Sequence, residues 1–398
     1  MKKRILSVVF AMLLLAGCNN ESKIETNLGN PGSYVEATAT YDWMAGESPV
    51  PNRRMGIVRV GLSNIIHAVS ATGVYYRVAE GNKTYIIYAD NGSNQWVKLC
   101  GRPDCTHDNT DCNAYIPNCS KLSYYNGYLY AMLGDGSEQE SKLIRMDPDG
   151  SNRVDVLDLL GFAKEKGGDF IRCDLITDGV CIFQTRRWVE VENNGNTSIT
   201  GERMDYYIYR LDGSMEKPVL QQSSGVMYNC GDTVLSYSLD TKYGGDYGSY
   251  WSWNPKTEEQ VYLTDHPGVP GYFDEHQGYY FKDGTIRRLN YADRDEEILV
   301  ETGLEGAYVL LCFPECMVLA SRTDGENADN MLYFYNWAFE LVDTVELTYP
   351  HTIRPEWLIA SETAERLILC DDTYTPRYYI NKSELGTGNA KIHSFNLL

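Results

Sequence analysis

The sequence has little positive charge. It carries 35 Lys and Arg against 55 Asp and Glu, a formal net charge of −20, and none of its charged runs is rich in Lys or Arg. Binding to a phosphate backbone requires a basic face that releases counterions. Nucleic acid is therefore excluded as an expected partner. The acidity favours solubility and does not by itself identify a ligand.

The sequence also lacks a hydrophobic run long enough to cross a bilayer comfortably. Residues 1–18, MKKRILSVVFAMLLLAGC, contain a short apolar stretch behind three basic residues. Basic, apolar and small-residue segments in this order predict a secretory signal over residues 1–17. Leu15-Ala16-Gly17-Cys18 resembles the bacterial lipobox, which implies diacylglycerol transfer to the Cys18 thiol and cleavage before it. The alternative is an ordinary secretory signal with a chance cysteine.

A folded domain is expected only after the polar segment that follows Cys18. Residues 18–54 comprise the expected lipidated cysteine and a flexible linker, because they are rich in Asn, Glu, Ser, Thr, Gly and Pro without a sustained apolar period. Residues 55–398 form the predicted domain. A chain held by acyl groups in this way would lie on the outer face of the bacterial cell membrane.

Helical periodicity is nearly absent from residues 55–398, where only residues 162–167 suggest a helical turn. Seven copies of a four-strand pattern recur instead, and residues 121–157 are the clearest copy. In that copy, Asn126-Gly127 joins the first two strands, since both residues tolerate the positive φ of a two-residue hairpin. The repeat predicts an all-β, seven-bladed β-propeller with four-stranded antiparallel blades. A β-sandwich, the alternative, does not explain the same strand order in seven copies.

Closed rings of this kind usually pair a strand from one terminus with the sheet of the other. Residues 55–61, MGIVRVG, precede the first copy and alternate well enough to serve as such a strand. They are expected to pack beside residues 391–397.

Common hydrolase motifs are missing as well. Neither G-x-S-x-G nor H-E-x-x-H occurs, and every histidine except His107 stands alone in its copy. Acidic residues are so numerous that no glycosidase-type pair can be selected. No catalytic residue is predicted. We expect a non-catalytic module that binds a glycan, a peptide or an envelope partner; the alternative is an extracellular polysaccharide hydrolase or lyase with an acidic site at the channel mouth.

One segment concentrates metal-ligating side chains: Cys100, Cys105, His107 and Cys112, with Cys119 seven residues further on. Thiolates and an imidazole can form a tetrahedral zinc site. Exported cysteines form disulfides by default, and a redox-active thiol is a third possibility. The spacing C-x4-C-x-H-x4-C does not decide between them. Calcium is not expected at the Asp-Gly turns, which lack the later bidentate Glu of an EF-hand.

Aromatic residues supply the candidate ligand-binding positions. In a Gly/Tyr-rich stretch and the strand after it, the candidates are Tyr243, Tyr247, Trp251 and Trp253. Exposed Tyr and Trp stack on sugars or dock proteins, whereas the core between blades is the alternative for both Trp residues. A second group comprises Arg186, Arg187 and Trp188, ahead of an expected polar loop that extends to residue 202.

The lipobox, the polar linker, the seven copies and the stretch LCGRPDCTHDNTDCNAY at residues 99–115 together resemble uncharacterised β-propeller lipoproteins of clostridial-type Gram-positive gut bacteria. The resemblance implies a lipid-anchored propeller outside the cell. It implies no activity, because that family has none established. It favours metal over disulfides at the Cys/His segment if the host exports proteins into a reducing space.

Overall fold

A computed structural model describes most of the chain from residue 67 onward. The described residues are 44–47, 49, 67–134, 140–177, 179–193, 196–221, 226–230, 233–238, 249–254, 257, 259–265, 270–274, 276–306, 308–321, 330–347, 359–370 and 375–396. The expected signal peptide, Cys18 and most of the expected linker lie outside them. Within these ranges, no helix is long and apolar enough to cross a membrane.

The described residues form seven four-stranded antiparallel sheets, and the strands of each sheet follow one another in the sequence. The strands of the first three sheets are β1 (His67–Val69), β2 (Gly73–Glu80), β3 (Lys83–Asp90), β4 (Val97–Lys98), β5 (Cys119–Tyr125), β6 (Tyr128–Leu133), β7 (Lys142–Met146), β8 (Val154–Asp158), β9 (Asp169–Thr177), β10 (Val180–Asn193), β11 (Asn196–Arg210) and β12 (Val219–Gln221).

The remaining four sheets follow the same order. Their strands are β13 (Val226–Cys230), β14 (Thr233–Ser238), β15 (Ser249–Asn254), β16 (Glu259–Asp265), β17 (Pro270–Phe273), β18 (Gln277–Lys282), β19 (Thr285–Asn290), β20 (Glu296–Glu301), β21 (Tyr308–Cys312), β22 (Met317–Ser321), β23 (Met331–Tyr335), β24 (Leu341–Glu346), β25 (Ile359–Glu362), β26 (Arg366–Cys370), β27 (Pro376–Asn381) and β28 (His393–Ser394). Seven sheets of four strands confirm the seven-bladed propeller, and we call each sheet a blade.

Blade two shows why the local sequence forms these strands. Tyr125 pairs with Tyr128, and the two residues between them have positive φ, 48° at Asn126 and 86° at Gly127. This is the backbone that a tight hairpin needs and that Asn and Gly adopt most easily. In β6, four consecutive residues are buried, as expected for a strand covered on both faces. The predicted turn is confirmed.

Helical structure among the described residues is limited to short segments. The α-helix α1 (Leu159–Glu165) covers part of the predicted helical turn, and the Asp158 carboxylate accepts a hydrogen bond from the Gly161 backbone N–H at 2.8 Å. Such an N-cap satisfies a donor that the first helical turn leaves free. A 3₁₀ helix, η3 (Lys382–Glu384), follows β27 in the last blade.

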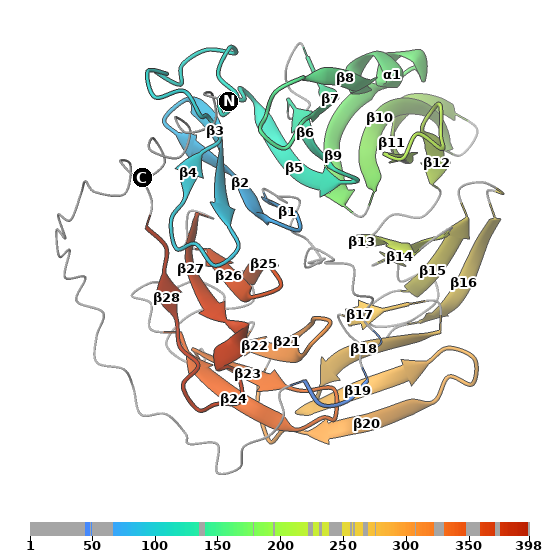
Figure 1. The fold of residues 1–398 in the computed structure, drawn as a ribbon. Helices are drawn as coiled ribbons and strands as arrows, with labels where there is room; N and C mark the ends of the chain where they lie inside the picture. Colours follow the sequence, from blue (N-terminus) through green and yellow to red (C-terminus); the bar gives the residue numbers. More distant parts are fainter. Residues whose placement is uncertain are drawn as a thin grey trace, which may run out of the picture. The chain divides into compact units, whose positions relative to one another are not determined.

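The blades follow one another around a centre, each with its first strand innermost (Figure 1). Inner strands of successive blades are in contact, including β1 with β5, β5 with β9 and β17 with β21, and β1 also contacts β25 of the last blade. The core lies between blades. One cluster of buried residues, for example, combines Tyr130 and Met132 of blade two with Phe183 of blade three.

Blade seven is complete without an N-terminal strand, because β25 to β28 all come from residues 359–394. The C-terminal end then joins blade one: Gln95 forms a parallel bridge with Asn396, and the Trp96 backbone N–H donates to Asn396 O at 3.0 Å. Residues 55–61, expected beside this blade, lie outside the described residues. Their position stays a prediction.

Blade three departs from the repeat by its length. β10 and β11 pair continuously from Val180–Arg210 to Asn193–Asn196, with one irregularity after Val189. The prediction of a loop from Trp188 to residue 202 is therefore wrong, since the strands continue through most of this segment.

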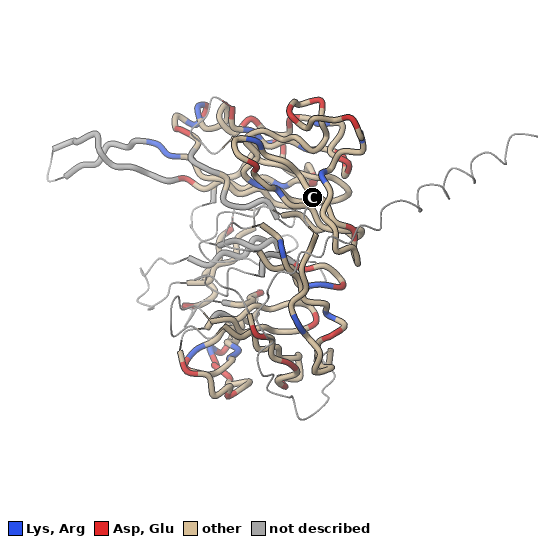
Figure 2. Tube along the Cα trace, turned by 90° about the vertical axis from the view of Figure 1, so that its left-hand side faces the viewer, with Lys and Arg blue, Asp and Glu red and all other residues tan. Residues whose placement is uncertain are grey.

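Figure 2 shows acidic and basic residues interspersed along the described trace, with no continuous basic stretch.

Candidate metal centre

The Cys/His segment, residues 100–113, interrupts the outer edge of blade one. Before it, Leu99 donates its backbone N–H to Ile86 O at 3.0 Å. After it, Ala114 accepts from Ile86 N–H at 2.9 Å, and Ile116 donates to Thr84 O at 2.9 Å. The chain thus leaves the edge of β3 at residue 100 and returns to it at residue 114, which brings the two ends of the segment together.

Four of the predicted ligands converge within this segment. The thiol sulfurs of Cys100, Cys105 and Cys112 and a ring nitrogen of His107 all lie within 4.8 Å of one another. The closest recorded approach joins His107 Nδ1 and Cys112 Sγ, 3.2 Å apart. Cys112 is buried and the other three are half-buried. Three sulfurs and one nitrogen so arranged are suited to a soft, tetrahedral metal ion.

Cys119 does not belong to this group, which corrects its inclusion among the candidate metal or disulfide residues. It opens β5 of blade two with 1% of its surface exposed. Its thiol donates a hydrogen bond to the backbone oxygen of Lys121 at 3.3 Å, and burial raises its pKa to about 12. A thiol in this environment stays protonated and acts as a small buried hydrophobe.

Positive charge lies beside the group. The Arg102 guanidinium approaches Cys105 Sγ at 3.4 Å and donates to Asp111 O at 2.7 Å. Burial tends to raise the pKa of the Cys100 thiol, but hydrogen bonds from the Arg102 backbone and side chain and from the neighbouring thiols lower it overall. At Cys112 burial is the larger influence, and the pKa is raised. Arg102 therefore favours negative charge at the exposed end of the group.

Blade two holds the buried end of the segment in place. The Arg153 guanidinium donates to Cys112 O at 3.2 Å, to Asn113 O at 2.7 Å and to Tyr115 O at 3.0 Å. A Cβ atom at Gly150 would lie 2.5 Å from Asn113 O, so this turn of blade two needs glycine to approach so closely. The segment consequently bridges the first two blades.

The aromatic candidates separate into buried and accessible positions. Trp253 is only 2% exposed and packs with Val180, Ile182 and Ile208 of blade three. This corrects the expectation that it binds a ligand. Trp251, two residues earlier, is half-buried and lies edge-on to Tyr262, with ring centroids 5.2 Å apart. Tyr243 and Tyr247 lie outside the described residues.

A groove that sequence reasoning missed begins at Tyr262. It has a volume of about 290 Å³, lies where β16 of blade four meets blade five, and is lined by Tyr262, Thr264, Asp265, Leu289, Arg294 and Glu296. Burial, and secondarily a hydrogen bond with Asp265, raise the pKa of Tyr262 to about 12, so its phenol stays protonated at neutral pH. The groove combines an aromatic side chain with charged groups of both signs.

The second predicted group lies along β10. Arg187 Nε lies 2.7 Å from Asp205 Oδ2 of the paired strand β11, and Asp205 is nearly buried. This ion pair gives Arg187 a structural role in the sheet. Arg186 is half-buried beside it, and the structure places Trp188 within β10 without describing its side chain.

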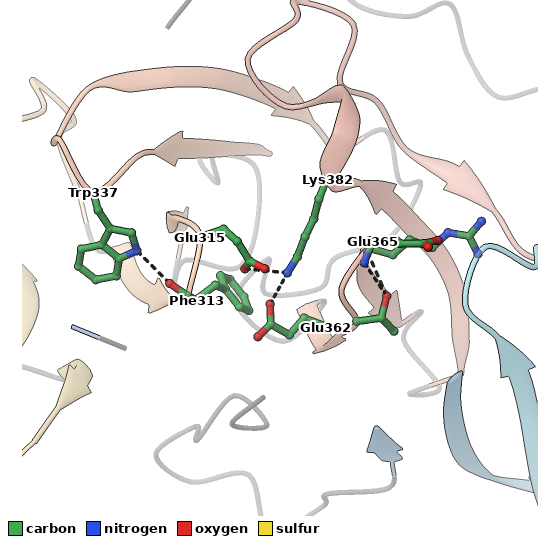
Figure 3. Close-up of polar contacts among 8 residues, drawn as sticks. Phe313, Glu315, Trp337, Glu362, Glu365 and Lys382 are labelled. Carbon is green, nitrogen blue, oxygen red and sulfur yellow. Dashed lines mark hydrogen bonds and ion pairs between the residues drawn. The ribbon is translucent and has the colours of Figure 1, made fainter. Parts of the chain in front are cut away.

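A buried ion-pair cluster was also missed by sequence reasoning. Figure 3 shows Lys382 reaching between Glu315 and Glu362, with Nζ 2.8 Å from Glu315 Oε2 and 2.7 Å from Glu362 Oε2. The side chains of Lys382 and Glu362 are each 3% exposed. Burial tends to lower the pKa of Lys382, but attraction to the two carboxylates raises it overall. The cluster joins blade six to blade seven.

No protein-family model matches the chain, and no curated protein matches it. Solved structures do. A puromycin-hydrolysing peptidase from Mycobacterium tuberculosis is 12% identical, with 90% of this chain and 56% of that chain covered and a TM-score of 0.50. An acylaminoacyl peptidase in complex with Z-Gly-Gly-Phe-chloromethyl ketone is 10% identical, with 86% and 52% covered and a TM-score of 0.50.

A third match is the β-propeller domain of the Trilobed protease from Pyrococcus furiosus, 12% identical, with 73% of this chain and 82% of that chain covered and a TM-score of 0.39. The chain spans about half the length of the two peptidases. At such identities the likeness to the two peptidases concerns the fold alone. No activity follows for this chain from the names of these proteins.

Proposed function

We propose that this chain is a non-catalytic glycan-binding module, anchored through lipid on Cys18 to the outer face of the bacterial cell membrane. The observation that carries the binding proposal is the groove between blades four and five, with Tyr262 on its wall and charged groups around it. Sugars present both apolar ring faces and hydroxyl groups. A site that offers an aromatic ring together with fixed polar groups suits both.

The dimensions of the groove limit the ligand. A volume of about 290 Å³ is at the lower end of the range for small-molecule sites, about 300–1,000 Å³. It accommodates one sugar ring of a longer chain rather than a large apolar ligand. Trp251 lies edge-on to Tyr262, and this contact restricts the movement of the Tyr262 ring, so that little conformational entropy is lost when a sugar stacks on it.

Hydrogen bonds from neighbouring side chains fix the two carboxylates of the groove. Asp265 Oδ1 accepts a hydrogen bond from Ser249 Oγ at 3.0 Å. Glu296 accepts from the Tyr280 hydroxyl and lies 3.1 Å from Arg287 NH1. Carboxylates fixed in this way can orient sugar hydroxyls. The hydrolase or lyase alternative becomes an outcome of the test.

Tyr262→Ala is expected to weaken glycan binding by about 30-fold, which corresponds to about 2 kcal/mol for an aromatic residue at the centre of a site. The full chain would be screened against bacterial and host glycans and cell-wall fragments, and the Kd of the best ligand measured for both proteins. Tyr128→Ala, a half-buried tyrosine of blade two, is the matched control and should leave Kd unchanged. The same Kd for Tyr262→Ala and the wild-type protein would show that the glycan binds at another site. Turnover of any glycan would favour the hydrolase or lyase.

Cys18→Ala is expected to move the chain from the membrane fraction to the soluble fraction, because the lipobox-like sequence then offers no thiol for lipid transfer. Fractionation of cells that express each protein, with mass analysis of the N-terminal peptide, measures this. Cys119→Ala, which removes a buried thiol of blade two, is the control and should stay with the membrane. An unmodified Cys18 in the wild-type protein would contradict the anchor without affecting the glycan proposal.

A further inference from the structure

We propose that Cys100, Cys105, His107 and Cys112 bind one structural zinc ion, and that this ion fixes the Cys/His segment between the first two blades. The proposal is independent of the glycan site on blades four and five. It decides between the metal and disulfide interpretations that the spacing alone leaves open.

The distances suit a tetrahedral site. With Zn–S bonds of about 2.3 Å and a Zn–N bond of about 2.0 Å, the ligand atoms of a tetrahedron lie about 3.5–3.8 Å apart. All four ligand atoms lie within 4.8 Å of one another, and one pair is already at 3.2 Å. Small side-chain movements complete the tetrahedron. Because the protein supplies all four ligands, no position is left for water or substrate, which defines a structural rather than a catalytic site.

A disulfide accounts for less of this arrangement. It would use two of the three thiols and give no role to the third or to the imidazole. His107 also adopts a left-handed backbone, with φ 54°, which is uncommon for residues other than glycine. This backbone conformation brings the His107 ring to Cys112, and a role of His107 as a metal ligand explains why the conformation is retained.

Charge balance agrees with zinc. Three thiolates, a neutral imidazole and a divalent ion carry one net negative charge. The Arg102 guanidinium, 3.4 Å from Cys105 Sγ, lies where it offsets that charge. The same guanidinium ties the segment together by donating to Asp111 O.

The segment has no core of its own. None of residues 100–111 is buried, whereas Cys112, Ala114 and Ile116 are. Short segments that bury so little apolar surface are commonly held by a metal or by disulfides. Since Ala114 pairs with β3 of blade one and Arg153 of blade two binds the carbonyls beside it, a zinc ion here would hold the segment at the junction of the two blades.

Metal analysis of the full chain, purified in detergent without chelators, tests the proposal. We expect one zinc ion per chain in the wild-type protein and in Cys119→Ser, and almost none in Cys105→Ser. Cys119→Ser is the matched control because it removes a neighbouring thiol outside the group. X-ray absorption at the zinc edge examines the wild-type site directly, so the result does not depend on whether a variant folds. We expect three sulfurs at about 2.3 Å and one nitrogen at about 2.0 Å.

Any of four results would overturn the proposal. The first is a disulfide between any two of Cys100, Cys105 and Cys112 in peptide mass spectra of the purified chain. The second is an absorption spectrum without sulfur ligands. The third is a chain that contains no metal after purification and, once reduced, fails to bind added zinc. Zinc retained at full stoichiometry by Cys105→Ser would likewise show that the ligand set is wrong.

Discussion

Lys382→Met is expected to lower the free energy of unfolding by about 3–5 kcal/mol, which is the usual effect of removing one partner from a buried ion pair. The substitution leaves the Glu362 carboxylate, only 3% exposed, without the ammonium group that lies 2.7 Å away. The cost of losing the ammonium group is smaller at Glu315, because 22% of its side chain is exposed to solvent. The expected loss reflects the removal of the ammonium group from beside a buried carboxylate rather than the value of the pair itself.

The three residues of the cluster lie in two different blades, so the loss of stability arises at the contact between those blades. Glu315 lies in the turn between β21 and β22 of blade six, Glu362 ends β25 of blade seven, and Lys382 begins η3 (Figure 3). The substitution therefore removes a link between two blades. We expect unfolding to begin with the separation of blades six and seven.

Stability should also depend on Lys382 at alkaline pH. The pKa of this lysine is raised in the folded protein, so its contribution is fully present below the pKa of an unfolded lysine, about 10.4. That contribution is lost as the pH rises through the higher pKa of the folded state. Lys382→Met should lack this part of the alkaline decline, while the wild-type protein shows it.

Urea unfolding of the full chain at neutral and alkaline pH measures both effects. Lys164→Met on the exposed face of α1 is the control and should change the free energy by no more than about 0.5 kcal/mol. Lys382→Met combined with Glu362→Leu should recover part of the loss, because the most deeply buried carboxylate is then gone. Similar midpoints for Lys382→Met and Lys164→Met would contradict a net stabilising role for the cluster.

The fold was predictable because its information is local. Each blade is marked by its own turn residues, and Asn126-Gly127 alone places β5 and β6 in register. The hairpin extension of blade three was not predicted, since residues 188–202 are polar and resemble a loop. A signal for the paired strands was nevertheless present, because residues 189–192 alternate Val and Glu and are followed by Asn194-Gly195, a typical hairpin dipeptide.

The same distinction explains which site residues were found. Cys100, Cys105, His107 and Cys112 converge within thirteen residues, so spacing alone suggested the group. Cys119 was assigned wrongly because a strand begins at that residue and carries its thiol into the core. Lys382 and Glu315 are 67 residues apart and meet only through the packing of two blades. Such a pair leaves no local pattern in the sequence.

The contact that joins the last blade to the first gives the second large expected effect. Trp96→Ala should lower the free energy of unfolding by about 3–5 kcal/mol, as for other buried tryptophans replaced by alanine. Trp96 is 1% exposed. The centroid of its ring lies 5.3 Å from that of Tyr76 in blade one and 5.0 Å from that of Phe395 near the C-terminus. The three rings belong to a buried cluster that includes residues of blades one and seven. Removing it leaves a cavity where the ring of blades closes.

Hydrogen exchange followed by mass spectrometry localises the effect, and urea unfolding measures its size. In Trp96→Ala, protection should fall first in β28 and in the residues that pair with Asn396, ahead of the other blades. Trp251→Ala, which truncates a half-buried tryptophan of blade four, is the matched control and should be destabilised less. Trp96→Phe should cost less than alanine, because it keeps an aromatic ring and removes an indole N–H without a recorded acceptor among the described residues. Equal losses in Trp96→Ala and Trp251→Ala would mean that the closure is not a critical contact of the ring.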